Sequence, residues 1–207
     1  MISLFIDTSS SDVSIALVKD NKILSSITKK IPNEHSIYTT SFLDKIIKDA
    51  NITPKDINKI MVVNGPGSFT GVRIGVTIAK VFAYLQNIDI ICVSSLKMRA
   101  LSLEHDYCLS IIDAKHDNYY LGLYNKENEE IIKEQFNNKE KVINIINKYN
   151  PSCISDKNIM IDNIDIKETK LDIVNIVNYY INTTPLNCHL VVPNYLKLPQ
   201  AMEEKRW

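Results

Sequence analysis

Glycine is scarce in this chain, with five residues among 207, and four of the five lie between Gly65 and Gly75. Gly122 is the last one, so most of the second half has no position where glycine lets backbone approach a nucleotide closely. Net charge is also missing, because 24 Lys and Arg residues balance 24 Asp and Glu residues. The surface has no general field to capture a phosphate backbone, and we do not expect tight nucleic-acid binding by this chain alone.

Cysteine pairs and long apolar runs are absent as well. The four cysteines are far apart in the sequence: Cys92, Cys108, Cys153 and Cys188. Without a C-x-x-C motif, we expect inert buried thiols in a reducing compartment. The start, MISLFIDTSS, has no basic leader, and the longest apolar helical pattern carries Arg73 and Lys80 and is too short to span a bilayer. We expect a soluble cytoplasmic protein without membrane contact.

The first hundred residues have the pattern of a mixed α/β lobe, residues 1–100. Apolar residues in ISLFID, VSIALVKD and KILSSIT predict three strands in a meander. A helix from an N-cap at Asn33 to Ala50 should follow, and then a buried strand, INKIMVVNG. After the glycine segment we expect a helix that ends near Gln86 and a short strand, DIICVS.

From residue 108 the pattern begins again. Asp7 aligns with Asp113 and Leu17 with Leu123, each pair in a strand, turn and strand of the same layout. Self-similarity at a long offset predicts a duplicated βββα unit. Helices near EKVINIINKYN and LDIVNIVNYYI, with a strand near SCISD, would complete a smaller second lobe, residues 101–207. The tail after Pro193 would lie over the surface.

Asp7 and Thr8 are candidate nucleotide-binding residues. Asp7 ends the first strand and precedes a hydroxyl-rich turn, TSSSD, which could receive a phosphate or a hydrated Mg²⁺. Sugar kinases, actin and the large heat-shock ATPases begin in this way. Those proteins also need glycine in a second phosphate hairpin and an adenosine loop, whereas DAKHD, the aligned turn here, has none. The alternative is a turn whose Ser and Thr side chains satisfy turn geometry.

Catalytic and metal-binding constellations are not visible in the sequence. Thr39 stands four residues after His35, so an H-x-x-x-H pair of ligands is missing. His116 with Asp113 and Asp117 could be drawn as a hydrolytic or metal cluster, but a polar hairpin turn explains them with fewer assumptions. No serine lies in a G-x-S-x-G elbow. We therefore predict no catalytic residue and no metal or cofactor bound by this chain alone.

The glycine segment GPGSFTG matches neither a dinucleotide fingerprint nor a P-loop, because its spacing differs from both and it has no lysine. We predict instead a loop before the second helix. In it Gly65, Pro66 and Gly67 turn the chain out of the sheet, and Ser68 or Thr70 caps the helix.

The helix after this loop has an apolar arc roughly twice as wide as the ~100° that one packing face needs. Five large residues suit the lobe's own sheet: Ile74, Ile78, Val81, Phe82 and Leu85. Beside them lies a groove of small residues, edged by Val72 and Val76: Gly71, Gly75, Ala79 and Ala83. A second packing surface is implied. A partner helix could occupy the groove, or another part of this chain could fill it.

Five segments in order carry a family resemblance: LFIDTSSSDVSIALV, EHSIYTTSFLDKII, NGPGSFTGVRIGVTIAK, VSSLKMRA and IIDAKHDNYYLGLY. They resemble the TsaB family of bacterial tRNA threonylcarbamoyladenosine (t6A) biosynthesis proteins over about residues 1–125, and PNYLKL resembles the family's ending. Lys115 stands where the family usually has arginine, which would offer a planar fork of donors. The resemblance implies an α/β, actin-like and heat-shock-ATPase-like (ASKHA) duplicated βββαβαβα fold with a reduced second lobe.

The same resemblance implies a non-catalytic subunit that forms a heterodimer with the related catalytic subunit TsaD through helices of the first lobe. The pair would work with an ATPase subunit, TsaE, to transfer a threonylcarbamoyl group to N6 of adenosine 37 in tRNAs that read codons beginning with A. ATP and metal would be used by the partner subunits, and tRNA would be met only through the complex.

We expect the interface with TsaD to use both first-lobe helices. The candidate residues are Tyr38, Phe42 and Lys45 on the first helix and Val72, Arg73, Val76, Ala79, Lys80 and Ala83 on the second. Arg73 and Lys80 would supply rim charges that set register. Without TsaD the same surface could pair with its own copy. The rival function is a standalone actin-like-fold ATPase or a sugar-kinase-like enzyme.

Overall fold

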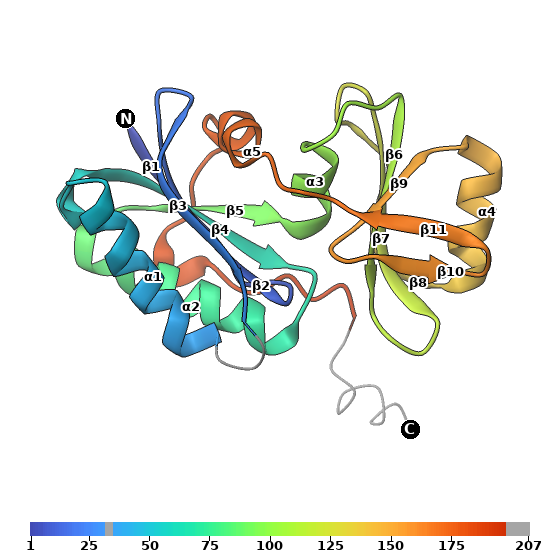
Figure 1. The fold of residues 1–207 in the computed structure, drawn as a ribbon, viewed down its shortest axis with the longest axis horizontal. Coiled ribbons are helices and arrows are strands. Elements are labelled where there is room, and N and C mark those ends of the chain that lie inside the picture. Colours follow the sequence, from blue (N-terminus) through green and yellow to red (C-terminus); the bar gives the residue numbers. More distant parts are fainter. Residues whose placement is uncertain (32–34, 198–207) are drawn as a thin grey trace.

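A computed structural model describes residues 1–31 and 35–197 of the chain. Two sheets lie side by side, with helices on their outer faces and one helix between them (Figure 1). The first half contains β1 (Ile2–Asp7), β2 (Asp12–Lys19), β3 (Lys22–Lys30), α1 (His35–Asp49), η1 (Pro54–Asp56), β4 (Ile57–Gly65), α2 (Phe69–Gln86), β5 (Ile90–Ser94) and α3 (Ser95–Ala100). The second half contains β6 (Tyr107–Asp113), β7 (Asn118–Asn125), β8 (Glu130–Asn138), α4 (Lys139–Tyr149), β9 (Ser152–Ser155), β10 (Ile159–Ile161), β11 (Ile164–Glu168), α5 (Ile173–Tyr180) and η2 (Cys188–Leu190).

The two sheets repeat one arrangement, which confirms the predicted duplicated fold. The first has the strand order β3-β2-β1-β4-β5 and the second β10-β11-β9-β6-β7-β8. β1 is antiparallel to β2 and parallel to β4, and β6 is antiparallel to β7 and parallel to β9. The aligned aspartates also agree, because Asp7 Oδ1 accepts the Ser9 N–H at 2.8 Å and Asp113 Oδ1 accepts the Lys115 N–H at 2.8 Å.

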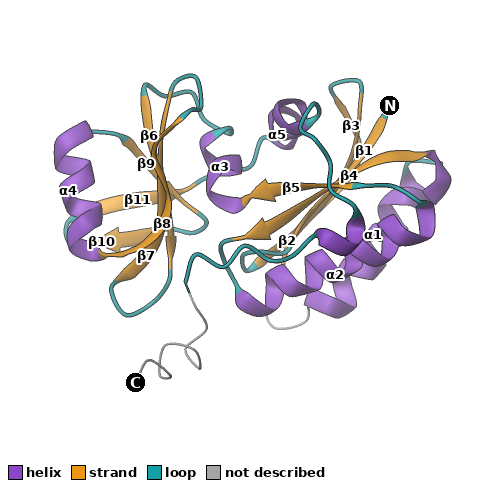
Figure 2. Cartoon of the chain, turned by 180° about the vertical axis from the view of Figure 1, so that it is seen from behind, coloured by secondary structure: helices purple, strands orange, loops and turns teal. Residues whose placement is uncertain are grey.

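Helices cover both faces of the first sheet. α1 and α2 lie next to each other on one face (Figures 1 and 2), where they bury Leu43, Ile46 and Val76 with residues of β1, β2 and β4. α5 covers the opposite face, with Ile176 and Val177 packed against strand residues of the same sheet. Alternate residues of β1 serve the two faces, as the period of two in a strand requires.

α5 corrects one expectation. The helix near LDIVNIVNYYI was predicted to complete the second lobe, but it packs on the first sheet because the chain returns there after β11. The segment that follows stays on the first lobe: Leu186 pairs with Ile90 through two backbone hydrogen bonds of 2.7 and 2.9 Å, and Val191 is buried in the core under α1 and α2. Residues from about 171 to 191 therefore belong to the packing of the first sheet, whereas Leu196 packs against strands of the second.

α3 and the β10–β11 hairpin were not predicted. α3 lies between the two sheets: Met98 packs against the first sheet, while Leu96 and Ala100 pack against strands of the second. The proposed N-cap Asn33 lies outside the described residues. Within residues 1–31 and 35–197, the structure contains no helix with the length and apolar character of a membrane span.

Candidate functional site

The glycines at the start of α2 permit close packing of this helix against the β1–β2 hairpin. Thr8 is fully buried, and its Oγ1 donates to the Gly71 carbonyl at 2.7 Å. A Cβ at Gly71 would lie within 3.0 Å of the Thr8 carbonyl oxygen, and one at Gly75 within 3.0 Å of Thr8 Oγ1. The hairpin itself therefore occupies the space that the missing Cβ atoms leave.

The loop before α2 turns as predicted. Gly65 ends β4 with φ 117°, and Gly67 has φ 154°, values that favour glycine. Ser68 is the N-cap: its Oγ accepts the Gly71 N–H at 3.2 Å, so the cap needs no bound anion. Ser68 N also donates to the Ser9 carbonyl at 2.7 Å, and Ser95 Oγ donates to the Pro66 carbonyl. Thr70, the other candidate cap, is exposed.

The two apolar arcs of α2 are exchanged relative to our prediction: the small-residue arc, and not the large-residue arc, lies against the sheet. Val72, Val76, Ala79 and Ala83, the predicted partner residues, are buried against β1, β2 and β4 of the chain's own sheet. Of the large residues predicted to lie on that sheet, Val81 and Leu85 are exposed and Ile74 is half-buried, whereas Ile78 and Phe82 are half-buried and pack partly against this core. The reason is the close approach of Thr8 and the sheet, which only a small-residue face allows. A second apolar surface does exist, but it is the large-residue arc.

The outer part of the large-residue arc forms a continuous stripe, which we call the α2 stripe: Ile74, Ile78, Val81 and Leu85. Val81 and Leu85 are exposed, and Ile74 and Ile78 are half-buried. The spacing of four, three and four residues is that of a helix–helix seam. At its N-terminal end, a groove of about 390 Å³ lies between α1 and α2, lined by Ser36, Thr40, Phe69, Thr70, Arg73, Ile74, Thr77 and Ile78.

The candidate residues of α1 divide by burial. Tyr38 is exposed at the first turns of α1, and its ring centroid lies 5.7 Å from that of Phe42. Phe42 itself belongs to the core, so it offers no free surface. Lys45 is exposed and forms an ion pair with Asp49 at 2.8 Å, one helical turn further on. Tyr38 and Lys45 are therefore accessible to a partner, and the buried Phe42 ring packs against the Tyr38 ring.

Arg73 and Lys80 bind the chain's own C-terminal segment, a role that the sequence did not predict. Arg73 Nε donates to the Tyr195 hydroxyl at 2.7 Å. Lys80 Nζ donates to the Val191 carbonyl at 2.9 Å and to the His189 carbonyl at 3.4 Å. The residues joined by these hydrogen bonds are 109 to 122 positions apart in the sequence, so no local sequence pattern predicts the contacts.

Asp7 lies in a cleft of about 550 Å³ between the lobes, which Arg99, Asp156 and Lys167 also line. Burial raises the pKa of Asp7, although the nearby Arg99 guanidinium acts in the opposite direction. Thr8, its predicted companion, points away into the α2 contact and has no exposed surface. The structure thus places only one of the two nucleotide candidates at a cleft.

The second hairpin lines a neighbouring hollow of about 480 Å³ together with Ser9 to Ser11. Lys157 Nζ contacts Asp113 Oδ2 at 3.0 Å. Partial burial acts to raise the pKa of Asp113, but the Lys115 N–H and the Lys157 ammonium hold it below its ordinary value. His35 Nε2 lies 3.0 Å from the Ser10 carbonyl, so this histidine ties α1 to the first hairpin. Among the described residues, no cluster of three or more His, Cys, Asp or Glu is arranged to hold a metal ion.

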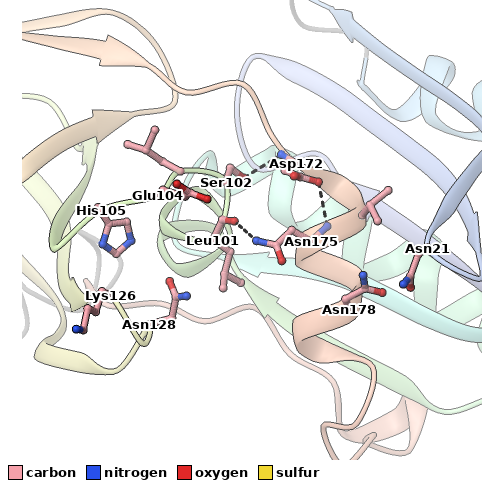
Figure 3. A pocket seen from close by; sticks show the side chains of 12 residues that line it. Asn21, Leu101, Ser102, Glu104, His105, Lys126, Asn128, Asp172, Asn175 and Asn178 are labelled. Carbon is pink, nitrogen blue, oxygen red and sulfur yellow. Dashed lines mark hydrogen bonds between the residues drawn. The ribbon is translucent and has the colours of Figure 1, made fainter.

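A third hollow lies between α5 and the chain that follows α3 (Figure 3). Asn175 Nδ2 donates to the Leu101 carbonyl at 2.5 Å, and the Asp172 N–H donates to Ser102 Oγ at 3.0 Å. The ring of His105 stands at its edge, and burial lowers the pKa of this imidazole. These bonds fix α5 to the connection between the lobes.

Residues 22–177 match the sequence model of the family described as TsaD: tRNA N6-adenosine threonylcarbamoyltransferase. The tRNA threonylcarbamoyladenosine biosynthesis protein TsaB of Bacillus subtilis (strain 168) is 37% identical over 140 residues, which are 65% of this chain and 61% of that protein. The protein of the same name from Escherichia coli (strain K12) is 31% identical over 128 residues, 60% of this chain and 55% of that protein.

The chain thus spans about three fifths of the length of the curated relatives it matches. Among solved structures, YeaZ from Pseudomonas aeruginosa superposes with a TM-score of 0.79 at 20% identity, over 94% of this chain and 99% of that one. A likeness at this identity shows that the two chains share a fold.

Proposed function

We propose a function on the premise that this chain belongs to the TsaD family, tRNA N6-adenosine threonylcarbamoyltransferase, in which it is a TsaB/YeaZ-type protein. The protein acts in t6A biosynthesis as a non-catalytic scaffold. It forms a heterodimer with a TsaD-type catalytic subunit and supports threonylcarbamoylation of N6 of adenosine 37 in tRNAs that read codons beginning with A. TsaE joins this pair, ATP and metal are used by the partner subunits, and tRNA is met only through the complex.

The exposed α2 stripe is the observation that carries this proposal. Contiguous large apolar side chains on a soluble domain mark a surface that another protein covers. Here they follow a helical seam, and Ile37 and Tyr38 of the adjacent α1 are exposed as well. An apolar stripe on α2, with two exposed large side chains at the start of the neighbouring α1, suits a bundle with helices of a partner.

The state of the first hairpin supports a non-catalytic role. The Thr8 hydroxyl donates to the Gly71 carbonyl of α2, and Gly67, Gly71 and Gly75 leave space for the β1–β2 hairpin rather than for a phosphate. The rival is a standalone actin-like-fold ATPase, for which Asp7 at the cleft is the best feature. Isothermal calorimetry of the isolated chain with Mg-ATP separates the two, because micromolar binding would favour the ATPase.

The heterodimer is tested with a charge placed in the α2 stripe. Leu85 is 69% exposed, and Met160 on β10 is 63% exposed and far from α2 in the sequence, so Leu85→Asp and Met160→Asp form a matched pair. If Leu85 is buried by the partner, Leu85→Asp should weaken binding to TsaD from the same source by at least about tenfold. Met160→Asp should bind as the unmodified chain does.

Several outcomes would contradict the proposal. Equal binding by both variants would exclude the α2 stripe as the interface, and no binding by the unmodified chain would exclude the heterodimer. Reconstituted tRNA modification should fall with Leu85→Asp in proportion to lost binding. Sedimentation without TsaD tests for a homodimer through the same stripe, which the same variant should dissociate.

A further inference from the structure

We propose that Tyr195 is a positioning residue of the partner-binding surface: it holds Arg73 and Phe69 in place as one wall of the α1–α2 groove. The inference rests on the proposed function, because the groove adjoins the α2 stripe. It assigns the C-terminal segment a part in partner binding although this segment lies more than a hundred residues after α2 in the sequence.

Three side chains form a stacked cluster at the N-terminal end of α2. The Arg73 guanidinium carbon lies 3.7 Å from the Phe69 ring centroid and 5.7 Å from that of Tyr195. The two ring centroids are 5.6 Å apart, and the Tyr195 hydroxyl accepts the Arg73 Nε–H at 2.7 Å. The cation lies over the face of the Phe69 ring, and its hydrogen bond to the Tyr195 hydroxyl fixes the rotation of the guanidinium.

This cluster is on the surface, where its members would otherwise sample many rotamers. Phe69, Arg73 and Tyr195 are all exposed. An arginine in water loses substantial rotamer entropy when a partner immobilises it. Because Tyr195 immobilises Arg73 in the free protein, the rotamer entropy of Arg73 is lost during folding. Binding a partner then loses less entropy, and the affinity is higher.

Tyr195 can do this only because the backbone around it is anchored. The Asn194 N–H donates to the Asn64 carbonyl at 2.7 Å, and Asn64 Nδ2 donates to the Val192 carbonyl at 3.1 Å. A Cβ at Gly65 would lie 2.8 Å from the Asn194 carbonyl oxygen, so glycine at the end of β4 makes room for the segment. Beyond Tyr195, Lys197 Nζ lies 4.9 Å from the Phe136 ring centroid on β8.

The occupant of the groove follows from its chemistry. Phe69, Ile74 and Ile78 supply an apolar lining of a size that suits single side chains. α2 carries two basic residues, Arg73 and Lys80, and no acidic residue. The structure therefore favours an amphipathic helix of the TsaD-type partner, with an apolar side chain in the groove and a carboxylate facing Arg73.

The experiment compares Tyr195→Phe, Arg73→Met and the double variant for binding to the TsaD subunit by calorimetry. Tyr195→Phe keeps the ring and removes the hydroxyl, so affinity should fall about three- to tenfold with no change in melting temperature. The double variant should bind no more weakly than Arg73→Met, because Tyr195 acts through Arg73. Tyr107 on β6 is 40% exposed against 41% for Tyr195, and Tyr107→Phe, the matched control, should bind normally.

Normal binding by Tyr195→Phe, or losses that multiply in the double variant, would overturn the positioning role. A second readout does not need the partner: the Arg73 Nε–H should be protected from solvent exchange in NMR spectra of the free chain and unprotected in Tyr195→Phe. Equal exchange in both chains would also overturn it. Failure of the unmodified chain to bind TsaD would instead overturn the proposed heterodimer, while this exchange measurement would still decide the role of Tyr195.

Discussion

The close approach of Thr8 to Gly75 predicts that Gly75→Ala changes stability in opposite directions, depending on whether residue 8 is threonine or alanine. A Cβ at residue 75 would lie within 3.0 Å of Thr8 Oγ1, while Thr8 Cβ would be at an ordinary 3.6 Å. Only the hydroxyl is therefore in the way. Gly75→Ala should destabilise the unmodified protein, and the same substitution should be tolerated or favourable when Thr8 has been replaced by alanine.

The magnitudes come from three terms. Forcing Cβ against Thr8 costs about 1–3 kcal/mol for overpacking. Loss of the Thr8 hydrogen bond to the Gly71 carbonyl costs about 1 kcal/mol. Alanine in a helix interior returns about 1 kcal/mol relative to glycine. Gly75→Ala should thus lower the free energy of unfolding by about 1–3 kcal/mol alone and raise it by up to about 1 kcal/mol after Thr8→Ala.

Urea unfolding followed by circular dichroism measures the four chains of this double-mutant cycle. The expected coupling is about 2–4 kcal/mol, and Gly75→Ala alone should lower the melting temperature by about 2–4 °C for each kcal/mol. Thr77→Ala, at an exposed position of α2, is the control and should change stability little. Additive effects of the two substitutions, or stabilisation by Gly75→Ala alone, would refute the packing that we describe.

Three further predictions concern buried groups and the C-terminal segment. Because burial raises the pKa of Asp7 above 3.8, the folded chain holds this proton more tightly than the unfolded chain. The stabilisation that Asp7 contributes is complete below about pH 4 and is lost as pH rises through the folded-state pKa. Urea titrations at several pH values should show this loss of stability in the unmodified chain and not in Asp7→Asn. Burial raises the pKa of Cys108 to about 12 and that of Cys153 to about 11, so both thiols should resist alkylation until the protein unfolds, as mass spectrometry can check. Lys80→Met removes the donor to the Val191 carbonyl and should speed amide hydrogen exchange in residues 189–195 while leaving β1 unchanged.

The strands and the main helices could be predicted because their signals are local, and the internal duplication because the same strand and turn pattern recurs about a hundred residues later. Periods of two and about 3.6 in apolar residues, the turn glycines and the Ser68 cap act within a few residues. The resemblance of the first half to a known family added the fold class. Sequence reasoning did not find α3, because this helix is short. It did not find the Arg73–Tyr195 contact, because the two residues are far apart in the sequence and come together only in the folded chain.

By itself the sequence determined that α2 has two apolar arcs and therefore two packing surfaces. Tertiary structure alone decided which arc is buried, because Thr8, 63 residues before Gly71, comes so close that only the small-residue arc fits beneath it. It also decided where α5 and the C-terminal segment pack, since an apolar stripe specifies burial but not the surface that covers it. The partner surface that we propose is the arc that the chain's own sheet left exposed.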